Sequence, residues 1–291
     1  MFYARYPLLT ARYFFHMKTI GVIGLGIIGG TWAKHYHAAG VLAGVWNRTP
    51  QPAFPQWRAT PEAVAAAADV MQIVVADPPA VRGVLEKILP VLGPGKIVMQ
   101  SSTIDPASSD EFRTAVLARG ARYLEAPFTG SKIAAEQRKN VFYLGGDSAL
   151  IAELEPLLAL ISEARMRIGD HRQATVLKLA MNLNICAVLE GLSEALVMAR
   201  RAGITDDVLF GALAINVGNS AFAKLKELKL RSGDFAPQFS VKHMLKDMRL
   251  AEGTPSGANL PLLATMRGQL AAAAQAGWAD EDIAAVLKLL K

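Results

Sequence analysis

The feature that most constrains the fold of this chain is a run of closely spaced glycines near its N-terminus. Ile20, Val22 and Ile23 predict a short buried strand, and residues 31–39 predict a helix. Between the strand and the helix stands a hexapeptide with the spacing G-x-G-x-x-G, from Gly24 to Gly29. A strand, this spacing and a helix, in that order, indicate a unit that binds a dinucleotide.

Each glycine of the hexapeptide has a separate physical role. The first permits a tight turn, the second lets the backbone approach a pyrophosphate, and the third lets the helix pack close to the strand. The N-terminus of the helix adds free N–H groups and a partial positive charge. The other interpretation is a tight turn in a doubly wound sheet that binds no ligand. We expect the cofactor to contact Gly24, Leu25, Gly26, Ile27, Ile28 and Gly29.

The residues after the second predicted strand indicate which dinucleotide binds. This strand, residues 41–46, ends in Asn47-Arg48-Thr49. An NAD enzyme usually carries Asp or Glu here, which binds the 2′-hydroxyl of the ribose. A neutral amide, a guanidinium and a hydroxyl instead suit a 2′-phosphate, because Arg pairs well with phosphate oxygens. We predict NADP(H), with Asn47, Arg48 and Thr49 as ligands; the alternative is a solvated turn with an incidental arginine.

The pattern of strands and helices divides the chain into two domains. Strands alternate with helices up to a last predicted strand at 165–168, which is typical of a doubly wound, mostly parallel sheet. From Ala174 onward only helices are predicted, and the first, 174–202, is apolar almost all round. We therefore predict a Rossmann domain at 17–173 and an all-α domain at 174–291. Residues 1–16 precede Met17 and are expected to be an extra arm or a start placed too early.

Polar loops follow three of the predicted strands, at the end where an open α/β sheet binds ligands. Asp77 follows the strand at 70–76 and is expected near the cofactor. The hydroxyls of residues 101–103 suit either the nicotinamide ribose or the cap of the next helix, near Pro106. The third loop offers the hydroxyls of Thr129 and Ser131 and the backbone of Gly130 as a nest for a substrate carboxylate.

A lysine and an asparagine interrupt the long apolar helix. Lys178 and Asn182 are four residues apart and therefore share a face. Burial lowers the pKa of a lysine, which makes Lys178 a candidate general acid near neutral pH. The alternative is a lysine that extends to solvent from the edge of the helix. Lys246 is a second candidate, which could reach the cofactor or only pair with Asp247 or solvent.

Composition excludes several other classes of function. The net charge is +6, but no Lys/Arg stripe interleaves with aromatic residues, so we expect anionic small ligands rather than nucleic acid. Cys186 is the single cysteine, which excludes an intramolecular disulfide and a cysteine-based metal cluster. No apolar run approaches the ~18 residues of a membrane span, so we expect no membrane contact and a cytoplasmic location.

Taken together, these motifs resemble the β-hydroxyacid dehydrogenase family, which includes 3-hydroxyisobutyrate dehydrogenases and glyoxylate/succinic semialdehyde reductases. The resemblance runs from about Met17 to the C-terminus. Two segments, residues 125–132 and 242–247, are most similar to the glyoxylate/succinic semialdehyde reductase branch. The resemblance to the family as a whole rests on Gly24–Gly29, Trp46–Thr49, Ser102-Thr103, Glu125–Lys132, Lys178 with Asn182, and Phe239–Asp247.

The resemblance implies a role for several residues. Lys178 would be the catalytic acid, supported by Asn182, and Thr129 with Gly130 would bind the substrate carboxylate. Thr103 and Lys246 would contact the cofactor. It also implies a long interdomain helix and a helical domain that mediates a homodimer or tetramer. The family's usual Pro-Val-Ser-Gly is Pro127-Phe128-Thr129-Gly130 here, and Arg172 and Ala174 replace glycines, so the substrate pocket is expected to differ.

The sequence therefore predicts an NADPH-dependent reductase of a small aldehyde or keto acid that carries a carboxylate. One alternative is an imine reductase on the same fold, although such relatives often have another residue where Lys178 stands. A second alternative is a protein that binds NADP or oligomerises without catalysis, which the altered residues 128, 172 and 174 favour and Lys178 opposes. A phosphosugar decarboxylase is less expected, because the C-terminal part is short.

Overall fold

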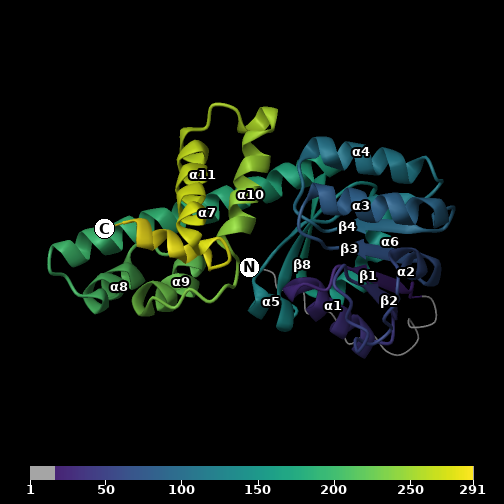
Figure 1. The fold of residues 1–291 in the computed structure, drawn as a ribbon, viewed down its shortest axis with the longest axis horizontal. Helices are drawn as coiled ribbons and strands as arrows, with labels where there is room; N and C mark the ends of the chain where they lie inside the picture. The colour runs from purple at the N-terminus through teal and green to yellow at the C-terminus, as the bar shows by residue number, and fades with distance from the viewer. Residues whose placement is uncertain (1–16, 291) are drawn as a thin grey trace, which may run out of the picture.

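The computed structural model describes residues 17–290, so the prediction for residues 1–16 lies outside the described part. The first domain alternates strands and helices, and the second is helical (Figure 1). The first contains β1 (Ile20–Ile23), α1 (Ile27–Ala38), β2 (Leu42–Trp46), α2 (Pro61–Ala67), β3 (Val70–Ile73), α3 (Pro78–Ile88), β4 (Ile97–Gln100), α4 (Pro106–Leu117), β5 (Arg122–Glu125), β6 (Phe128–Thr129), α5 (Lys132–Glu136), β7 (Asn140–Gly145), α6 (Ser148–Ala159) and β8 (Ser162–Gly169). The second contains α7 (His171–Arg201), α8 (Asp206–Ile215), α9 (Ala221–Ser232), α10 (Val241–Glu252) and α11 (Pro261–Ala273), then a π turn (Ala274–Trp278) and a 3₁₀ helix (Ile283–Leu289).

The sheet confirms the predicted doubly wound, mostly parallel architecture. Its strand order is β2-β1-β3-β4-β5-β7-β6, with β8 also paired to β7. Strands β1 to β5 are parallel, whereas β7 runs antiparallel to β5 and β6. β6 and α5 were not predicted from the sequence, which indicated only a polar loop there. Elements of two and five residues are too short to show a periodic pattern.

The strand order places the glycine-rich turn at the point where ligands bind in such sheets. The chain passes from β1 to β2 on one side, and β3 then lies on the other side of β1. The loops after β1 and β3 therefore separate, which opens a crevice at the carboxyl ends of these strands.

The glycines of this turn have the geometry that their predicted roles require. Gly24 has φ +110°, and a Cβ added to it would lie 2.3 Å from the carbonyl oxygen of Val74. A Cβ on Gly29 would lie 2.0 Å from the carbonyl oxygen of Gly24. By contrast, a Cβ added to Gly26 would have no other atom within 4 Å. The first and third glycines thus serve packing, and the second leaves room for a ligand.

The two faces of the sheet carry separate hydrophobic layers. α1 and α6 cover one face through buried residues such as Trp32, Tyr36 and Leu154. α2, α3 and α4 cover the other face, with Phe112 at its centre. A third cluster fills the helical domain between α7, α10 and α11.

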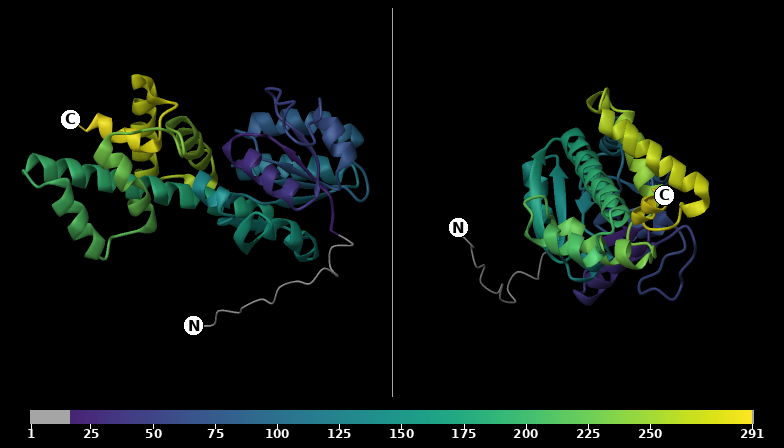
Figure 2. Two further views of the ribbon diagram at one scale, coloured as in Figure 1. Left: turned by 90° about the horizontal axis from the view of Figure 1, so that it is seen from below. Right: turned by 90° about the vertical axis from the view of Figure 1, so that its left-hand side faces the viewer.

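Helix α7 joins the two domains and runs from the end of the sheet into the centre of the helical domain (Figure 2). It begins at His171, three residues before the predicted start, because Asp170 and Gln173 form a reciprocal capping box. Its first turn is attached to α4 through Asp110, which accepts hydrogen bonds from Arg172 at 2.7 Å and lies 2.7 Å from His171 Nε2.

The length of α7 corrects one expectation from the sequence. Its most apolar 18-residue window has a mean hydropathy of 1.4, which is enough for a membrane span by length and composition alone. Core helices of folded domains meet the same criterion, although only 39% of this window is buried. α7 packs against α4 and β7 of the first domain and against α10 of the second, as a central helix does.

We predict that Gly29→Ala destabilises the first domain, because the new methyl group would overlap the Gly24 carbonyl. The midpoint of chemical denaturation should fall, with a loss of about 2–3 kcal/mol in the free energy of unfolding. Gly30→Ala is the matched control. A Cβ at Gly30 would have its nearest neighbour at 3.6 Å, an ordinary contact, so stability should hold or rise. Equal stability of the two variants would contradict this account of the turn.

Candidate active site

A chain of polar contacts crosses from the helical domain to the sheet domain and connects four residues that the sequence analysis singled out. The Nζ of Lys178 donates to Oδ1 of Asn182 at 2.9 Å. The Nδ2 of Asn182 donates to Oδ2 of Asp247 at 2.6 Å. Lys246 lies 2.8 Å from Oδ1 of Asp247 and donates to the carbonyl oxygen of Thr103 at 3.0 Å. α7, α10 and the loop after β4 thus meet at one place.

Asp247 is the one residue in this series of polar contacts that was not predicted from the sequence as a site residue. Its side chain is 1% exposed, between the buried Met244, Leu245 and Met248 of α10. A carboxylate on the apolar face of an amphipathic helix was the available signal. Such a group is costly to bury unless it has partners, and here Asn182 and Lys246 supply them.

The surroundings of Lys178 favour loss of its proton near neutral pH. Burial lowers the pKa of Lys178 to about 8. The negative charge of Asp247 opposes this shift, and the positive charge of Lys246 adds to it. The ammonium also lies over the ring of Phe128, 5.8 Å from its centroid. Lys178 is therefore a half-buried group next to opposite and like charges, and not a lysine that extends freely to solvent.

The predicted carboxylate-binding loop lies next to Phe128 and has a fixed backbone. Thr129 pairs with Val141 in the sheet, and its carbonyl accepts a hydrogen bond from Nδ2 of Asn140 at 3.4 Å. Gly130 has φ +132° and is packed so closely that a Cβ would lie 2.3 Å from the same Nδ2. Ser131 caps α5 and accepts from the amide of Ala134 at 3.5 Å. Binding of a carboxylate by these residues stays a prediction.

Asn47 has a structural contact that the sequence analysis did not foresee. Its Oδ1 accepts from the backbone N–H of Leu25 at 3.0 Å, and its Nδ2 donates to the carbonyl of Thr49 at 3.0 Å. Asn47 thus ties the loop after β2 to the glycine turn. Arg48 and Thr49 are exposed, and Arg48 forms no salt bridge within residues 17–290. Its guanidinium is available for an anion beside the turn.

The other predicted cofactor contacts lie in loops at the same edge of the sheet. Asp77 caps α3, with Oδ1 accepting from the amide of Ala80 at 2.8 Å. The cap of α4 is Asp105, so the hydroxyls of residues 101–103 do not cap that helix. Ser102 instead accepts from the amide of Val75 at 2.8 Å and joins the loops after β3 and β4.

Glu125 is a second buried carboxyl group that the sequence analysis did not single out. It accepts hydrogen bonds from Gln100, Ser109 and Tyr123 at 2.6–2.8 Å. Burial raises its pKa to about 8, against the effect of these donors. Gln100 also bonds to the backbone of Ser102, so Glu125 supports the loop that Lys246 contacts.

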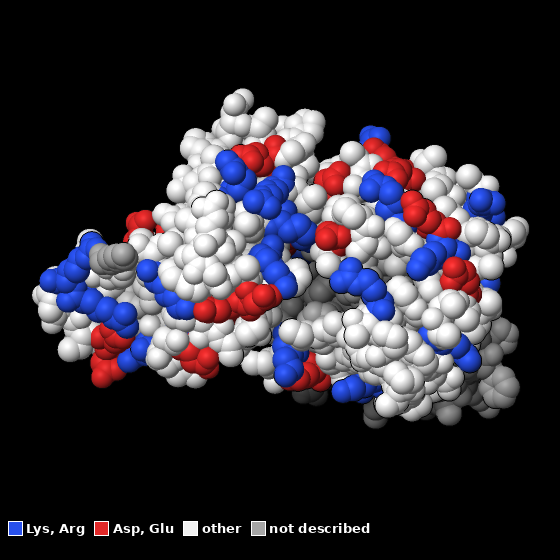
Figure 3. All heavy atoms as spheres, in the orientation of Figure 1, with Lys and Arg blue, Asp and Glu red and all other residues white. Residues whose placement is uncertain are grey.

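The residues present fit a bound dinucleotide. The turn leaves open space at Gly26, and α1 begins without a side-chain cap, so its first N–H groups can bind a pyrophosphate. Figure 3 shows the molecule hollowed between the two domains, with Lys and Arg side chains on the side formed by the helical domain. α10 contributes Lys242, Lys246 and Arg249. Within residues 17–290 no group of His, Cys, Asp and Glu is placed to hold a metal ion.

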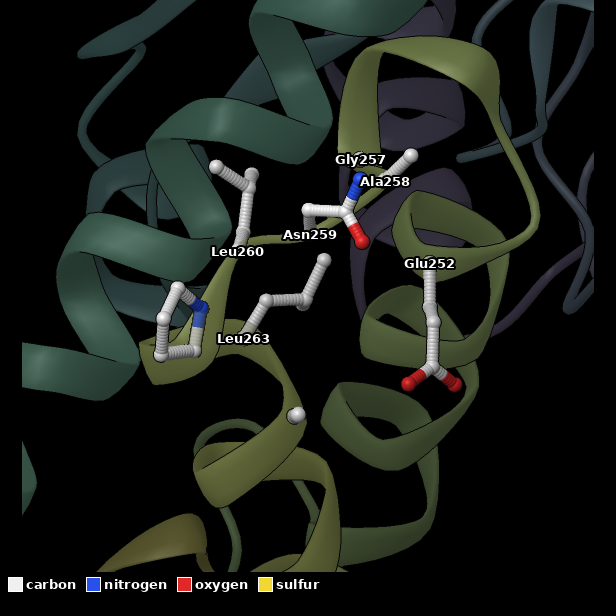
Figure 4. A pocket seen from close by; sticks show the side chains of 8 residues that line it. Glu252, Gly257, Ala258, Asn259, Leu260 and Leu263 are labelled. Carbon is white, nitrogen blue, oxygen red and sulfur yellow. The ribbon is translucent and has the colours of Figure 1, made fainter.

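A separate cavity of about 390 Å³ lies at the end of α10, away from these residues (Figure 4). It is lined by Glu252, Gly257, Asn259 and Leu263, among others. Glu252 pairs with Arg267 at 2.7 Å. None of the predicted site residues lines this cavity.

Two family models together match nearly the whole described chain. Residues 19–169 match the NAD binding domain of 6-phosphogluconate dehydrogenase. Residues 173–290 match a model described as NAD-binding of NADP-dependent 3-hydroxyisobutyrate dehydrogenase. The boundary between the two models falls at the start of α7.

Individual relatives agree with these models. Glyoxylate/succinic semialdehyde reductase 2, chloroplastic, of Arabidopsis thaliana is 29% identical over 94% of this chain and 79% of its own length. The cytokine-like nuclear factor N-PAC of Anopheles gambiae is 28% identical over 91% of this chain, which spans only 49% of that protein. The crystal structure of 3-hydroxyisobutyrate dehydrogenase from Salmonella typhimurium superposes with a TM-score of 0.83 at 28% identity, covering 93% of this chain and 99% of that one.

The matched models, the shared architecture and the glycine turn agree on one assignment. The chain belongs to the 3-hydroxyisobutyrate dehydrogenase family of β-hydroxyacid dehydrogenases, which are NAD(P)-binding oxidoreductases.

Proposed function

We propose that this chain is an NADPH-dependent reductase that interconverts a small carboxylate-bearing aldehyde or keto acid with the corresponding hydroxy acid. The observation that carries the proposal is the half-buried Lys178, which binds Asn182 and, through it, Asp247 at the junction of the two domains. A lysine with a pKa of about 8 can both donate and accept a proton near neutral pH.

Each residue of the junction has a distinct part in this reaction. The cofactor, when bound, supplies or accepts the hydride. Lys178 protonates the carbonyl oxygen in the direction of reduction and removes the hydroxyl proton in the direction of oxidation. Asn182 orients the ammonium, and Asp247 orients Asn182 through a 2.6 Å hydrogen bond. Lys246 fixes the loop of Thr103, next to the crevice, and so connects the cofactor side to the proton donor.

The charges at the junction favour an anionic substrate. Lys178 and Lys246 are two potential cations, and Asp247 is the buried anion beside them. With both lysines protonated, the group carries one uncompensated positive charge. A substrate carboxylate would balance this charge, and the nearby Thr129, Gly130 and Ser131 offer hydroxyl and backbone donors for its oxygens.

The chain is also similar to a protein that is named a cytokine-like nuclear factor and not an enzyme, which favours a second candidate, a protein that binds NADP(H) without catalysis. The contacts that connect Lys178 to Asn182 and Asp247 argue against this candidate, because a half-buried lysine beside a buried carboxylate is costly without a function. An imine reductase on the same fold is a further alternative.

One experiment separates these three functions. NADPH oxidation should be followed with glyoxylate, succinic semialdehyde, methylmalonate semialdehyde and a cyclic imine. Turnover of an acid supports the proposal, turnover of the imine alone supports the imine reductase, and binding without turnover supports the second candidate.

We predict that Lys178→Met removes most of the reductase activity and leaves NADPH binding intact. Methionine keeps the length and apolar character of the side chain but has no proton to donate. The value of kcat should fall by about 10²- to 10⁴-fold. Steady-state kinetics and NADPH fluorescence titration measure the two effects. Lys224→Met, on the exposed surface of α9, is the control and should behave as the parent does. Retention of kcat in Lys178→Met would refute the assigned role.

We predict a pH dependence that follows the titration of Lys178. Reduction needs the protonated ammonium, so its rate should be constant below about pH 8 and fall above it. Oxidation needs the neutral amine and should rise over the same range. Because Asp247 raises the pKa of Lys178, Asp247→Asn should move the falling limb of reduction to lower pH. A limb that stays in place, or moves to higher pH, would contradict this electrostatic account.

We predict that Arg48 determines the preference for NADPH over NADH. Arg48→Gln removes the guanidinium that faces solvent beside the glycine turn. Because a hydrogen bond to a charged group contributes about 1.5–3 kcal/mol, the Kd for NADPH should rise by about tenfold to hundredfold. The Kd for NADH, which has no 2′-phosphate, is the internal control and should not change. A parallel loss of both affinities would mean that Arg48 acts on the fold of the loop.

A further inference from the structure

Phe128 is held firmly from one side by an aromatic cluster. Its ring meets Trp32 of α1 edge-on, with 4.6 Å between ring centroids, and lies 6.0 Å from the ring of Phe142 on β7. Trp32 and Phe142 are fully buried in the core between α1 and the sheet, whereas Phe128 is only half-buried. The core therefore fixes the position of the ring and leaves part of its surface uncovered.

The same aromatic cluster also holds the loop that carries the candidate substrate contacts. Nε1 of Trp32 donates to Oδ1 of Asn140 at 2.9 Å, and Nδ2 of Asn140 donates to the carbonyl of Thr129 at 3.4 Å. A movement of the Phe128 ring into the core would have to displace Trp32 and break these contacts. The ring consequently behaves as a rigid surface.

The ring of Phe128 also lies below the candidate proton donor. Nζ of Lys178 lies 5.8 Å from the centroid of Phe128, within the range of a cation–π contact. A carbonyl oxygen that receives a proton from Nζ must lie at about 2.6–3.2 Å from it. Groups attached to the carbonyl carbon on that side would therefore meet the phenyl ring.

We propose that Phe128 is a specificity-determining residue that forms a rigid apolar wall beside Lys178. The wall admits acids whose carbon next to the reacting carbonyl is unbranched and excludes those that carry a branch there. This inference rests on the proposed function and narrows its substrate class. Glyoxylate and succinic semialdehyde should be accepted, and methylmalonate semialdehyde, which is branched at that carbon, should be a poor substrate.

The first test compares two variants that shorten the wall by different amounts. Phe128→Val opens more space than Phe128→Leu, and both residues fit a strand or its edge. The ratio of kcat/KM for methylmalonate semialdehyde to that for succinic semialdehyde should rise about tenfold in Phe128→Val. Phe128→Leu should show a smaller rise, and it serves as the test should the valine variant not fold. Ile133→Val, an exposed apolar position on the neighbouring α5, is the control and should leave the ratio unchanged.

A second measurement does not depend on turnover. Acetic anhydride and the branched isobutyric anhydride acylate a free amine, and mass spectrometry quantifies the product at Lys178. In the parent, the isobutyryl reagent should react more slowly relative to the acetyl reagent at Lys178 than at an exposed lysine such as Lys224. Phe128→Val should reduce this difference. Ile133→Val should not.

The two measurements separate the failure of this inference from failure of the proposed function. If the parent turns over none of the acids, the proposed function fails, and the acylation ratio alone decides whether Phe128 forms a wall. If the acids are turned over but neither Phe128 variant changes the substrate ratio, the inference is overturned. A change of equal size for branched and unbranched acids would overturn it as well.

Discussion

The candidate site depends on one set of contacts that crosses between domains. Asn182 of α7 and Asp247 of α10 bind each other inside the helical domain, and Lys246 extends from α10 to the carbonyl of Thr103 in the sheet domain. Neither domain holds a complete site by itself, because the glycine turn belongs to the first and the proton donor to the second. The capped start of α7 and its attachment to α4 through Asp110 fix the relative placement on which these contacts depend.

The phosphate-binding part and the chemical part of this junction are formed in different ways. The phosphate-binding part is formed by local geometry, since Gly24, Gly26 and Gly29 lie within one turn and the start of one helix. The chemical part is formed only by tertiary contacts. A change at the domain boundary should therefore affect catalysis more strongly than nucleotide binding. Catalysis requires both domains, whereas nucleotide binding requires mainly the first domain.

Sequence reasoning succeeded where a property is local and failed where it depends on distant partners. The roles of Gly24 and Gly29 follow from chain geometry over six residues, and Lys178 with Asn182 follows from the helical repeat. The contact between Lys246 and Thr103 joins residues 143 positions apart, and no spacing predicts it. The residue pattern and the family resemblance both pointed to these two positions, but neither showed that the residues touch.

The elements that were not predicted, or were predicted with other bounds, differ for equally specific physical reasons. Strand β6 has two residues, and only its pairing with β7 makes it a strand. The start of α7 was misplaced although Asp170 and Gln173 stand at capping-box spacing and were a readable signal. The membrane-like hydropathy of α7 was not predicted, because Lys178 and Asn182 interrupt the apolar run although the average over 18 residues stays high.

A shifted pKa alone does not distinguish a proton donor from a structural group in this protein. Burial places the pKa of both Lys178 and Glu125 at about 8. Glu125 is fully buried and accepts from three side chains, so its oxygens are occupied and no substrate can reach them. Lys178 has three N–H groups, and within the described residues only Asn182 accepts from them. The unused donor capacity, rather than the shift, is what supports the proposal that Lys178 gives a proton to a substrate.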